Sequence, residues 1–388
     1  MKTVVIRAPL LSYSGYGEHS RQIFRWLEKR GDINLISQIV QWGTTTWMIN
    51  GEMEDGLIGR IMESSKPIEG NPDVSFQVQL PDEWDPSLAK FNVGVSAFVE
   101  TDKCNPEWIK NINSMDLVIV PTTFVKNTIQ NTGNVTTPVI VVHESFNDFV
   151  TRNIDPLPIQ VDTKFNFLIV GQFTGDDPWC DRKNLFFTIK WLCEAFQDDP
   201  DVGIIIKTNH GKGTRIDRGI TRNKLSQLVA EVRSGQYPRL HLVHGNLTSE
   251  EIAGIYRHES CKCLVSLTRG EGFGLPLLEA AASKVPVIVT NWSGHLDFMK
   301  LGKFIPINYN LKQIPGSRSD GRIFIEGSRW AEPIEDDFKR KVKKFRNSYE
   351  KPMAWAADLS EKITENFSHE KICSYYNSAW DKYVEKIR

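Results

Sequence analysis

The sequence has no apolar run that approaches the length of a membrane span, and its cysteines are few and scattered. Of the six, only Cys261 and Cys263 lie close together, two positions apart on a predicted strand. This argues against a disulfide framework and against a zinc site, and is typical of a reducing compartment. The opening residues, MKTVVIRAPLLSYSG, have only short, broken apolar stretches, unlike a secretory signal. We therefore expect a cytoplasmic protein.

The charge of the chain is nearly balanced, with a formal net charge of −1 at pH 7. Residues 1–150 carry 18 acidic and 12 basic side chains, so this half as a whole does not favour anionic lipid. One dense basic cluster, residues 339–346, follows three acidic residues at 335–337, and we interpret it as a solvated helix face. We expect no stable membrane insertion. Nucleic acid is disfavoured as a partner, although the basic cluster leaves it open.

Length and periodicity predict two α/β domains. The 388 residues exceed what one core usually supports, and short β-branched runs alternate with amphipathic segments. A polar, proline-containing stretch at 147–162 is typical of a hinge. Predicted strands are residues 3–8, 34–40, 91–99, 117–120, 139–142, 165–171, 202–206, 240–243, 261–267 and 285–290; predicted helices are residues 21–30, 107–113, 123–131, 184–196 and about 368–386. This alternation is typical of doubly wound parallel sheets.

The most informative segment is EGFGLPLLEA, which starts at Glu271 and contains Glu279. It follows the predicted strand 261–267 and leads into a helix whose first turn accommodates Pro276. Glu271 is therefore expected in the loop and Glu279 about one turn into the helix. The free amides of Gly272, Phe273, Gly274 and Leu275, with the positive end of the helix, predict an anion site. Carboxylates for hydroxyls beside amides for phosphate are what a sugar nucleotide requires.

This segment resembles the E-x7-E motif of retaining glycosyltransferases of the family-4 type, which have the GT-B fold. The resemblance implies two doubly wound Rossmann-like domains that face each other across a cleft, with the last helix crossing back to the first domain. On this chain, the first, acceptor-side domain would comprise residues 1–155 plus about 368–388. The nucleotide-sugar-binding domain would comprise residues 156–367.

Two cations are expected to hold the donor diphosphate. Family members use a lysine where Lys183 stands, and often an arginine directly after the preceding strand, where this chain has Gln172. Arg182 is the candidate replacement for that arginine. A leaving nucleoside diphosphate gains negative charge, which fixed cations and amides stabilise.

In the first domain, Gly15, Tyr16 and Gly17 form a glycine-containing loop after the first predicted strand, where a backbone can approach a ligand. The third glycine of the dinucleotide fingerprint is missing, which disfavours a nicotinamide enzyme. Glu100 follows the predicted strand 91–99. Its context resembles one branch of these enzymes, which implies a role near the acceptor hydroxyl, and a solvated loop carboxylate is the equal alternative.

The resemblance implies a retaining, metal-independent transferase that moves a sugar from a nucleotide sugar to an acceptor hydroxyl, and we expect that hydroxyl to belong to a saccharide. Glu271, Lys183 and Glu100 would be the catalytic candidates. Gly15, Tyr16, Gly17, Arg182, residues 272–275 and Glu279 would bind substrate. No D-x-D motif is placed to hold a metal, and we expect no cofactor beyond the donor. A nucleic-acid base or a lipid as acceptor, and a noncatalytic sugar-nucleotide-binding protein, are the alternatives. The sequence does not select the donor base, the sugar, the acceptor or the oligomeric state.

Overall fold

The computed structural model describes residues 1–385, which form two compact units. Unit 1 comprises residues 1–145, 321–325 and the C-terminal segment that begins at Asn366. Unit 2 comprises residues 146–320 and 326–365. The chain therefore passes from one unit to the other several times.

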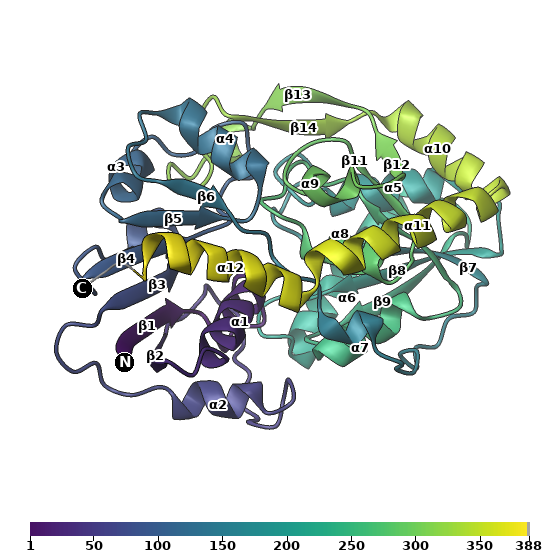
Figure 1. Ribbon diagram of the computed structural model, residues 1–388. Coiled ribbons are helices and arrows are strands. Elements are labelled where there is room, and N and C mark those ends of the chain that lie inside the picture. Colours follow the sequence, from purple (N-terminus) through teal and green to yellow (C-terminus); the bar gives the residue numbers. More distant parts are fainter. Residues whose placement is uncertain (386–388) are drawn as a thin grey trace. The chain divides into compact units, whose positions relative to one another are not determined.

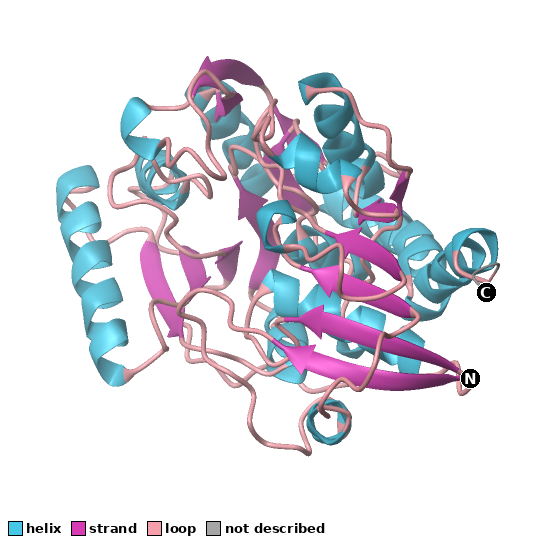
Figure 2. Ribbon diagram, turned by 90° about the vertical axis from the view of Figure 1, so that its left-hand side faces the viewer, coloured by secondary structure: helices cyan, strands magenta, loops and turns pink. Residues whose placement is uncertain are grey.

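Unit 1 is built on a six-stranded parallel sheet in the order β2-β1-β3-β4-β5-β6, and its arrows point the same way beside the N-terminus in Figure 2. The strands are β1 (Lys2–Ala8), β2 (Ile33–Ile39), β3 (Val74–Val78), β4 (Phe91–Val95), β5 (Leu117–Val120) and β6 (Val139–Val141). The helices are α1 (Gly15–Glu28), α2 (Leu57–Glu63), α3 (Trp108–Asn113), α4 (Thr123–Thr132) and α12 (His369–Tyr383), with a 3-10 turn η1 (Pro81–Glu83).

Strands β3 and β4 of unit 1 differ from the sequence prediction. Strand β3 was not predicted, because the polar residues Ser75 and Gln77 interrupt its apolar pattern. Both are buried nonetheless, since Ser75 Oγ donates to Asn92 Oδ1 at 2.7 Å and Gln77 Nε2 donates to the carbonyl of Asp85 at 2.7 Å. Strand β4 ends at Val95, so the predicted strand 91–99 is four residues too long.

Helix α1 begins at Gly15, six residues before the predicted start. The Ser14 side chain caps it by accepting a hydrogen bond from Gly17 N at 3.0 Å. Gly15 and Gly17 are weak helix formers, which is why the sequence favoured a loop here. The predicted loop is therefore wrong, and both glycines lie in the first helical turn.

The last helix, α12, belongs to unit 1, and it lies alongside α1 in Figure 1. Ser368 caps it by accepting a hydrogen bond from Lys371 N at 3.3 Å. Its rings pack on the sheet side of the unit: Tyr376 stacks on Trp26 with centroids 4.9 Å apart, and Trp380 stacks on Phe76 at 6.5 Å. Aromatic burial of this kind fixes the end of the chain to the N-terminal part of the unit.

Unit 2 is built on a second six-stranded parallel sheet, in the order β12-β11-β10-β7-β8-β9. The strands are β7 (Phe165–Val170), β8 (Val202–Thr208), β9 (Arg239–His244), β10 (Cys261–Ser266), β11 (Val287–Thr290) and β12 (Ile305–Ile307), and β13 (Tyr309–Gln313) pairs with β14 (Arg329–Pro333) in a separate antiparallel ribbon. The helices are α5 (Leu185–Ala195), α6 (Arg215–Val232), α7 (Ser249–Tyr256), α8 (Leu275–Ala282), α9 (Leu296–Met299), α10 (Glu335–Asn347) and α11 (Glu350–Phe367), with 3-10 turns η2 (Asp148–Thr151) and η3 (Gly316–Arg318).

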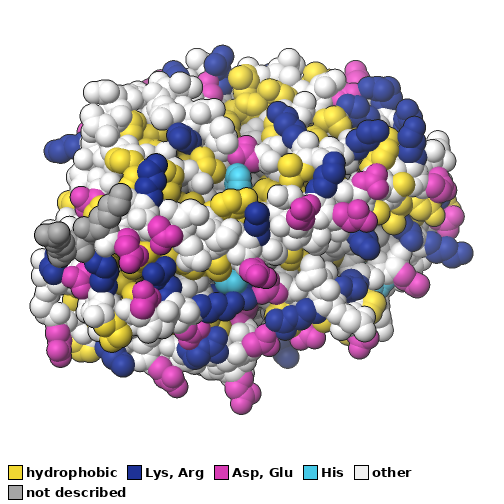
Figure 3. All heavy atoms as spheres, viewed as in Figure 1, with side chains coloured by type: hydrophobic (Ala, Val, Ile, Leu, Met, Phe, Trp, Pro, Cys, Tyr) yellow, Lys and Arg dark blue, Asp and Glu magenta, His cyan; other side chains and the backbone are white. Residues whose placement is uncertain are grey.

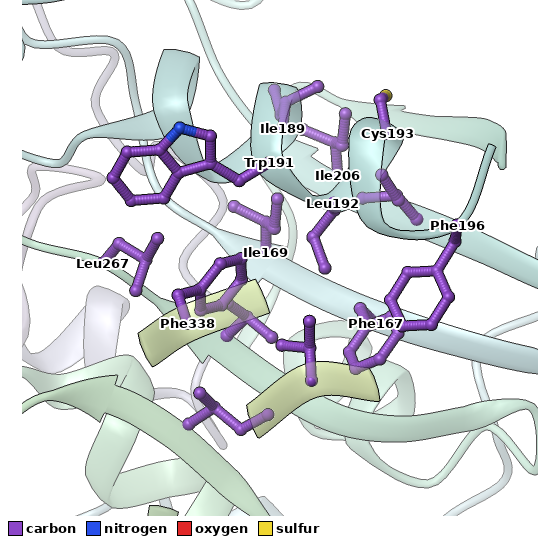
Figure 4. Close-up of a cluster of buried hydrophobic side chains, with 14 of the residues drawn as sticks. Phe167, Ile169, Ile189, Trp191, Leu192, Cys193, Phe196, Ile206, Leu267 and Phe338 are labelled. Carbon is purple, nitrogen blue, oxygen red and sulfur yellow. The ribbon is translucent and has the colours of Figure 1, made fainter. Parts of the chain in front are cut away.

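The core of unit 2 lies between the sheet and helices α5 and α10, as Figure 4 shows. Phe167 of β7 stacks on Phe196 with centroids 5.2 Å apart, and Phe338 of α10 is fully buried beside Trp191. Replacing a buried phenylalanine such as Phe167 by alanine typically costs about 3–5 kcal/mol of stability. This packing holds the carboxyl ends of the strands in fixed positions.

Both predicted parallel sheets are confirmed, and the chain has the architecture of two Rossmann-like domains. In the described part of the chain, no helix combines the length and the apolar character needed to cross a bilayer.

Candidate functional site

The site residues of unit 2 gather where the order of the strands reverses. Strands β7 and β10 are neighbours at the centre of the sheet, although the chain runs from β7 outward through β8 and β9 before it returns to β10. The loops that follow β7 and β10 therefore leave the same edge of the sheet in opposite directions. Ligands of open α/β sheets bind at such a switch point.

Glu271 is buried in the loop after β10, and two cations from the loop after β7 reach it. Lys183 Nζ donates to Glu271 Oε1 at 2.7 Å and to Oε2 at 2.8 Å. Arg182 Nη1 lies 3.3 Å from Glu271 Oε2 and donates to the carbonyl of Gly270 at 2.6 Å. The structure thus brings together three predicted site residues, although Lys183 and Glu271 are 88 positions apart in the sequence.

The electrostatics keep Glu271 ionised. Burial alone would raise the pKa of its carboxyl, but the charges of Lys183 and Arg182 and a hydrogen bond from Thr268 outweigh burial and lower the pKa to about 2. A buried carboxylate held this way presents acceptor oxygens that stay charged at any physiological pH.

Asp181 and Arg269 hold the loop that carries the two cations in position through hydrogen bonds. Asp181 Oδ2 accepts from Leu185 N at 2.7 Å, at the start of α5, and Oδ1 accepts from Thr174 N at 3.0 Å. Arg269 is fully buried and donates to the carbonyl of Asp181 at 2.6 Å. Its guanidinium also forms a bidentate pair with Glu332 of β14, at 2.8 and 2.9 Å. Arg269 therefore ties the cation loop to the β13–β14 ribbon.

The turn between Glu271 and α8 depends on glycine. Gly274 has φ +103°, in the left-handed region that other residues rarely adopt. Ser293 accepts a hydrogen bond from Glu271 N at 2.9 Å, and a side chain at the neighbouring Gly294 would lie 2.1 Å from the carbonyl oxygen of Gly272. Residues 291–297 therefore pack closely against this turn and help to fix its conformation.

The other residues of the predicted anion loop are in place around this turn. Phe273 is buried against Phe298, with ring centroids 5.3 Å apart, so its ring belongs to the core behind the turn. Leu275 is the first residue of α8, with Pro276 in the first turn as predicted. Glu279 is buried on α8 and accepts a hydrogen bond from the Tyr256 hydroxyl at 3.3 Å.

His295 lies beside the site, and the sequence analysis assigned it no role. Its Nε2 lies 2.8 Å from the carbonyl of Thr290, while its buried Nδ1 has no hydrogen-bond partner among the described residues. Burial lowers the pKa of His295 to about 4, so the imidazole is neutral at pH 7. Only its position after β11, at the carboxyl edge of the sheet, could have indicated a role.

Another buried cation, Lys207, lies at the end of β8. Lys207 Nζ donates to the carbonyl of Gly245 at 2.8 Å, and burial lowers its pKa to about 8. It fixes the Gly245 loop, which also receives a hydrogen bond from Asn209 Nδ2 to Asn246 Oδ1 at 2.7 Å. Gln172, at the position where an arginine was expected, is exposed. No group of three or more histidine, cysteine, aspartate or glutamate side chains in residues 1–385 is arranged to hold a metal ion.

The remaining predicted residues lie in unit 1. Gly15 and Gly17 flank Tyr16 in the first turn of α1, where the Tyr16 hydroxyl bonds Ser96 Oγ at 2.8 Å and its ring stacks on Trp42 at 4.0 Å. Glu100 is half-buried in the loop after β4 rather than at the end of a strand.

Three comparisons place these features among known proteins. Residues 219–314, which include Glu271 and Glu279, match the family model of glycosyl transferases group 1. A segment of 174 residues is 28% identical to the GtfA subunit of the UDP-N-acetylglucosamine–peptide N-acetylglucosaminyltransferase of Streptococcus parasanguinis. That match covers 44% of this chain and 28% of the relative, so the chain spans about a quarter of the curated relative it matches.

Solved structures of low sequence identity share the fold over almost the whole chain. A glycosyltransferase from Rickettsia africae superposes with a TM-score of 0.66 at 14% identity and covers 99% of both chains. The Anabaena protein HepE, solved with UDP and glucose, superposes with a TM-score of 0.62 at 12% identity, over 98% of this chain and 100% of its own.

Proposed function

Because this chain has the GT-B glycosyltransferase fold and carries a segment of the group 1 family, we propose that it transfers a sugar from a nucleotide-sugar donor to an acceptor hydroxyl. The observation that supports this most is the ionised carboxylate of Glu271, held by Lys183 and Arg182 beside the amides that precede α8. Charged acceptor oxygens for hydroxyls and fixed positive charge for a diphosphate then lie within one loop system.

In this proposal Glu271 accepts hydrogen bonds from hydroxyls of the donor sugar, and Glu279 accepts them from the ribose. The amides of residues 272–275, together with Lys183 and Arg182, bind the diphosphate. As the glycosidic bond breaks, the departing diphosphate gains negative charge, which these groups stabilise more strongly than they stabilise the bound donor.

The finer parts of the proposal are retention of the anomeric configuration, independence of metal ions, and a saccharide acceptor. Gly15, Tyr16, Gly17 and Glu100 of unit 1 would serve the acceptor side. UDP-sugars are the first donors to test, because HepE was solved with UDP and glucose and the GtfA relative is named for UDP-N-acetylglucosamine.

A donor panel tests the proposal directly. UDP-, GDP-, ADP- and TDP-sugars are each incubated with the protein, and nucleotide release is measured with and without saccharide acceptors. We expect release from one base class, with UDP first. Binding of a nucleotide sugar without release under any acceptor would favour the noncatalytic alternative, and neither binding nor release would rule out the transferase.

The acceptor class is decided by a second panel with the donor that reacts. Oligosaccharides, DNA and lipid vesicles are compared as acceptors, and the product is identified by mass. A saccharide product is expected, and its anomeric configuration, read by NMR, tests retention. Activity that persists after treatment with a chelator would support metal independence.

A further inference from the structure

Helix α6 of unit 2 is unusually exposed for its length. It has 18 residues, and only Thr221, Leu225 and Leu228 are buried. Arg215, Arg218 and Arg222 recur at intervals of three and four, which places them along one side of the helix. No ion pair joins any of these three arginines to a carboxylate in the part of the chain that the structure describes.

The side of α6 that carries these arginines faces an open sheet edge. Strand β9 ends the order of the sheet and pairs with β8 along one side only. A hollow of about 910 Å³ is lined by α6 and β9. Five arginines line it and no acidic side chain does: Arg215, Arg218, Arg222, Arg233 and Arg239.

The floor of this hollow, which we call the arginine groove, is apolar. Ile206, Leu225, Leu240 and Leu242 lie between the arginines. Arg239 is 3.3 Å from Asp162, and Arg233 Nη1 donates to the carbonyl of Pro238, while the buried Nε of Arg233 has no partner among the described residues. The arginine groove therefore combines unneutralised positive charge, apolar surface and an edge strand whose outer side is unpaired within the described sheet.

We propose that the arginine groove binds an acidic, extended polypeptide segment of a protein partner. An extended segment can pair its backbone with the open edge of β9, since an exposed edge strand accepts one more strand. Alternate side chains of that segment then point to opposite sides. The side chains that point toward α6 enter the arginine groove, where carboxylates meet Arg215, Arg218 and Arg222 and the aliphatic stems of the same side chains lie on the floor.

Two other anionic partners fit this surface less well. A nucleic acid presents phosphates and flat bases, and neither uses an apolar floor or a strand edge. A bilayer is flat and leaves a hollow unfilled, and the exposed Ile216 and Ile220 of α6 lie on a different side of the helix from the three arginines.

The probe that tests this is a fluorescent peptide of alternating glutamate and valine, titrated with the full-length protein at physiological salt and followed by anisotropy. The same peptide with lysine in place of glutamate is the first control and needs no variant. We expect binding of the glutamate peptide only, together with slower amide exchange in β9. Equal binding of both peptides, or unchanged exchange in β9, overturns the proposal.

A charge-reversal pair locates the binding site. Arg218→Glu with Arg222→Glu is expected to weaken the glutamate peptide by about tenfold or more, on the order of two lost charge pairs. The matched control is Lys343→Glu with Lys344→Glu, which makes the same change of net charge on α10, where basic side chains gather at the upper right of Figure 3. There we expect less than about a twofold effect.

Three results would contradict the proposal. Equal weakening by both variant pairs would show attraction to net charge alone. If a single-stranded DNA oligonucleotide bound more tightly than the peptide, and this binding were lost in Arg218→Glu/Arg222→Glu, the arginine groove would be assigned to nucleic acid. The same result with phosphatidylglycerol vesicles would assign it to a membrane. Thermal melting of each variant checks that it folds. If a variant does not fold, the comparison of the glutamate and lysine peptides on the wild-type protein still tests the proposal.

Discussion

The ammonium of Lys183 donates hydrogen bonds to both carboxylate oxygens of Glu271, and these two bonds are of almost equal length, 2.7 and 2.8 Å. The lysine comes from the loop after β7 and the glutamate from the loop after β10, so the pair joins the two central strands of the sheet at their carboxyl ends. Each charge is therefore held in position by the other. A substitution at either residue changes both the binding groups and the local stability, and experiments must separate the two.

A double-mutant cycle separates them. Glu271→Gln leaves Lys183 and Arg182 without their counter-charge and should destabilise the protein by on the order of 1–3 kcal/mol in urea titrations. Lys183→Met in the same background should restore part of that loss, because one unpaired cation is removed. Transfer activity, in contrast, should fall by about 10- to 100-fold or more in both single variants and should not recover in the double variant. Stability losses that simply add would contradict the coupling.

The depressed pKa of Glu271 predicts how stability depends on pH. The carboxyl has a pKa of about 2 in the folded protein against 4.5 as the ordinary value, so its contribution is fully present above pH 4.5 and is lost as the pH falls towards 2. The contribution is on the order of 3 kcal/mol. The free energy of unfolding of the wild type should therefore exceed that of Glu271→Gln at pH 7, and the difference should shrink near pH 3. A constant difference would mean that the carboxylate is not held by charge.

The first turn of α1 provides a pair of matched glycine substitutions. A methyl group at Gly17 would lie 2.1 Å from the carbonyl oxygen of Ser12, whereas one at Gly15 meets nothing within 4 Å. Gly17→Ala should lower the melting temperature by several degrees, since the backbone of residues 9–12 must shift, and Gly15→Ala should leave it within about one degree. Similar melting temperatures for both variants would show that the turn adapts freely.

A buried carboxylate in unit 1 should respond to pH in the opposite sense to Glu271. Burial, with a smaller effect from the charge of Glu18, holds the pKa of Glu144 well above its ordinary value. His19, with Nδ1 3.8 Å from Glu144 Oε1, gives it no positive charge, because burial lowers the pKa of His19 to about 3. The raised pKa of Glu144 favours folding at low pH and this advantage is lost as the pH rises through it. Glu144→Gln should therefore melt higher than the wild type at pH 8 and lose that gain near pH 4.

Much of the fold follows from patterns that the sequence displays. Runs such as β5 (Leu117–Val120) are apolar throughout, as buried parallel strands require, and the structure places them as predicted. Strand β3 was missed because Ser75 and Gln77 are buried with hydrogen-bond partners far along the chain, and no local pattern reveals such partners. The prediction placed the start of helix α1 too late, because the weak helix propensity of its glycines suggested a loop. In the structure the Ser14 cap extends the helix over them.

The site could be predicted only in part, and for a similar reason. Glu271 was identified from its local context, and Lys183 and Arg182 from the family resemblance. Their contact depends on the strand order, which neither source contains. Arg269 and His295 were not assigned a role. Arg269 pairs with Glu332 on a ribbon distant in sequence, and His295 is kept neutral by its burial, and neither property is visible in the local sequence. The roles assigned to Glu100 and to Gly15, Tyr16 and Gly17 stay predictions.

The position of α12 has a consequence for how the protein is made. Trp26 and Phe76 belong to the first hundred residues, but the rings that cover them, Tyr376 and Trp380, are synthesised only after all of unit 2. On the ribosome, unit 1 must therefore wait with an uncovered aromatic surface while the whole of unit 2 emerges. A chain that stops before α12 would keep that apolar surface exposed and prone to aggregation. Unit 2 can therefore complete its fold before unit 1 does.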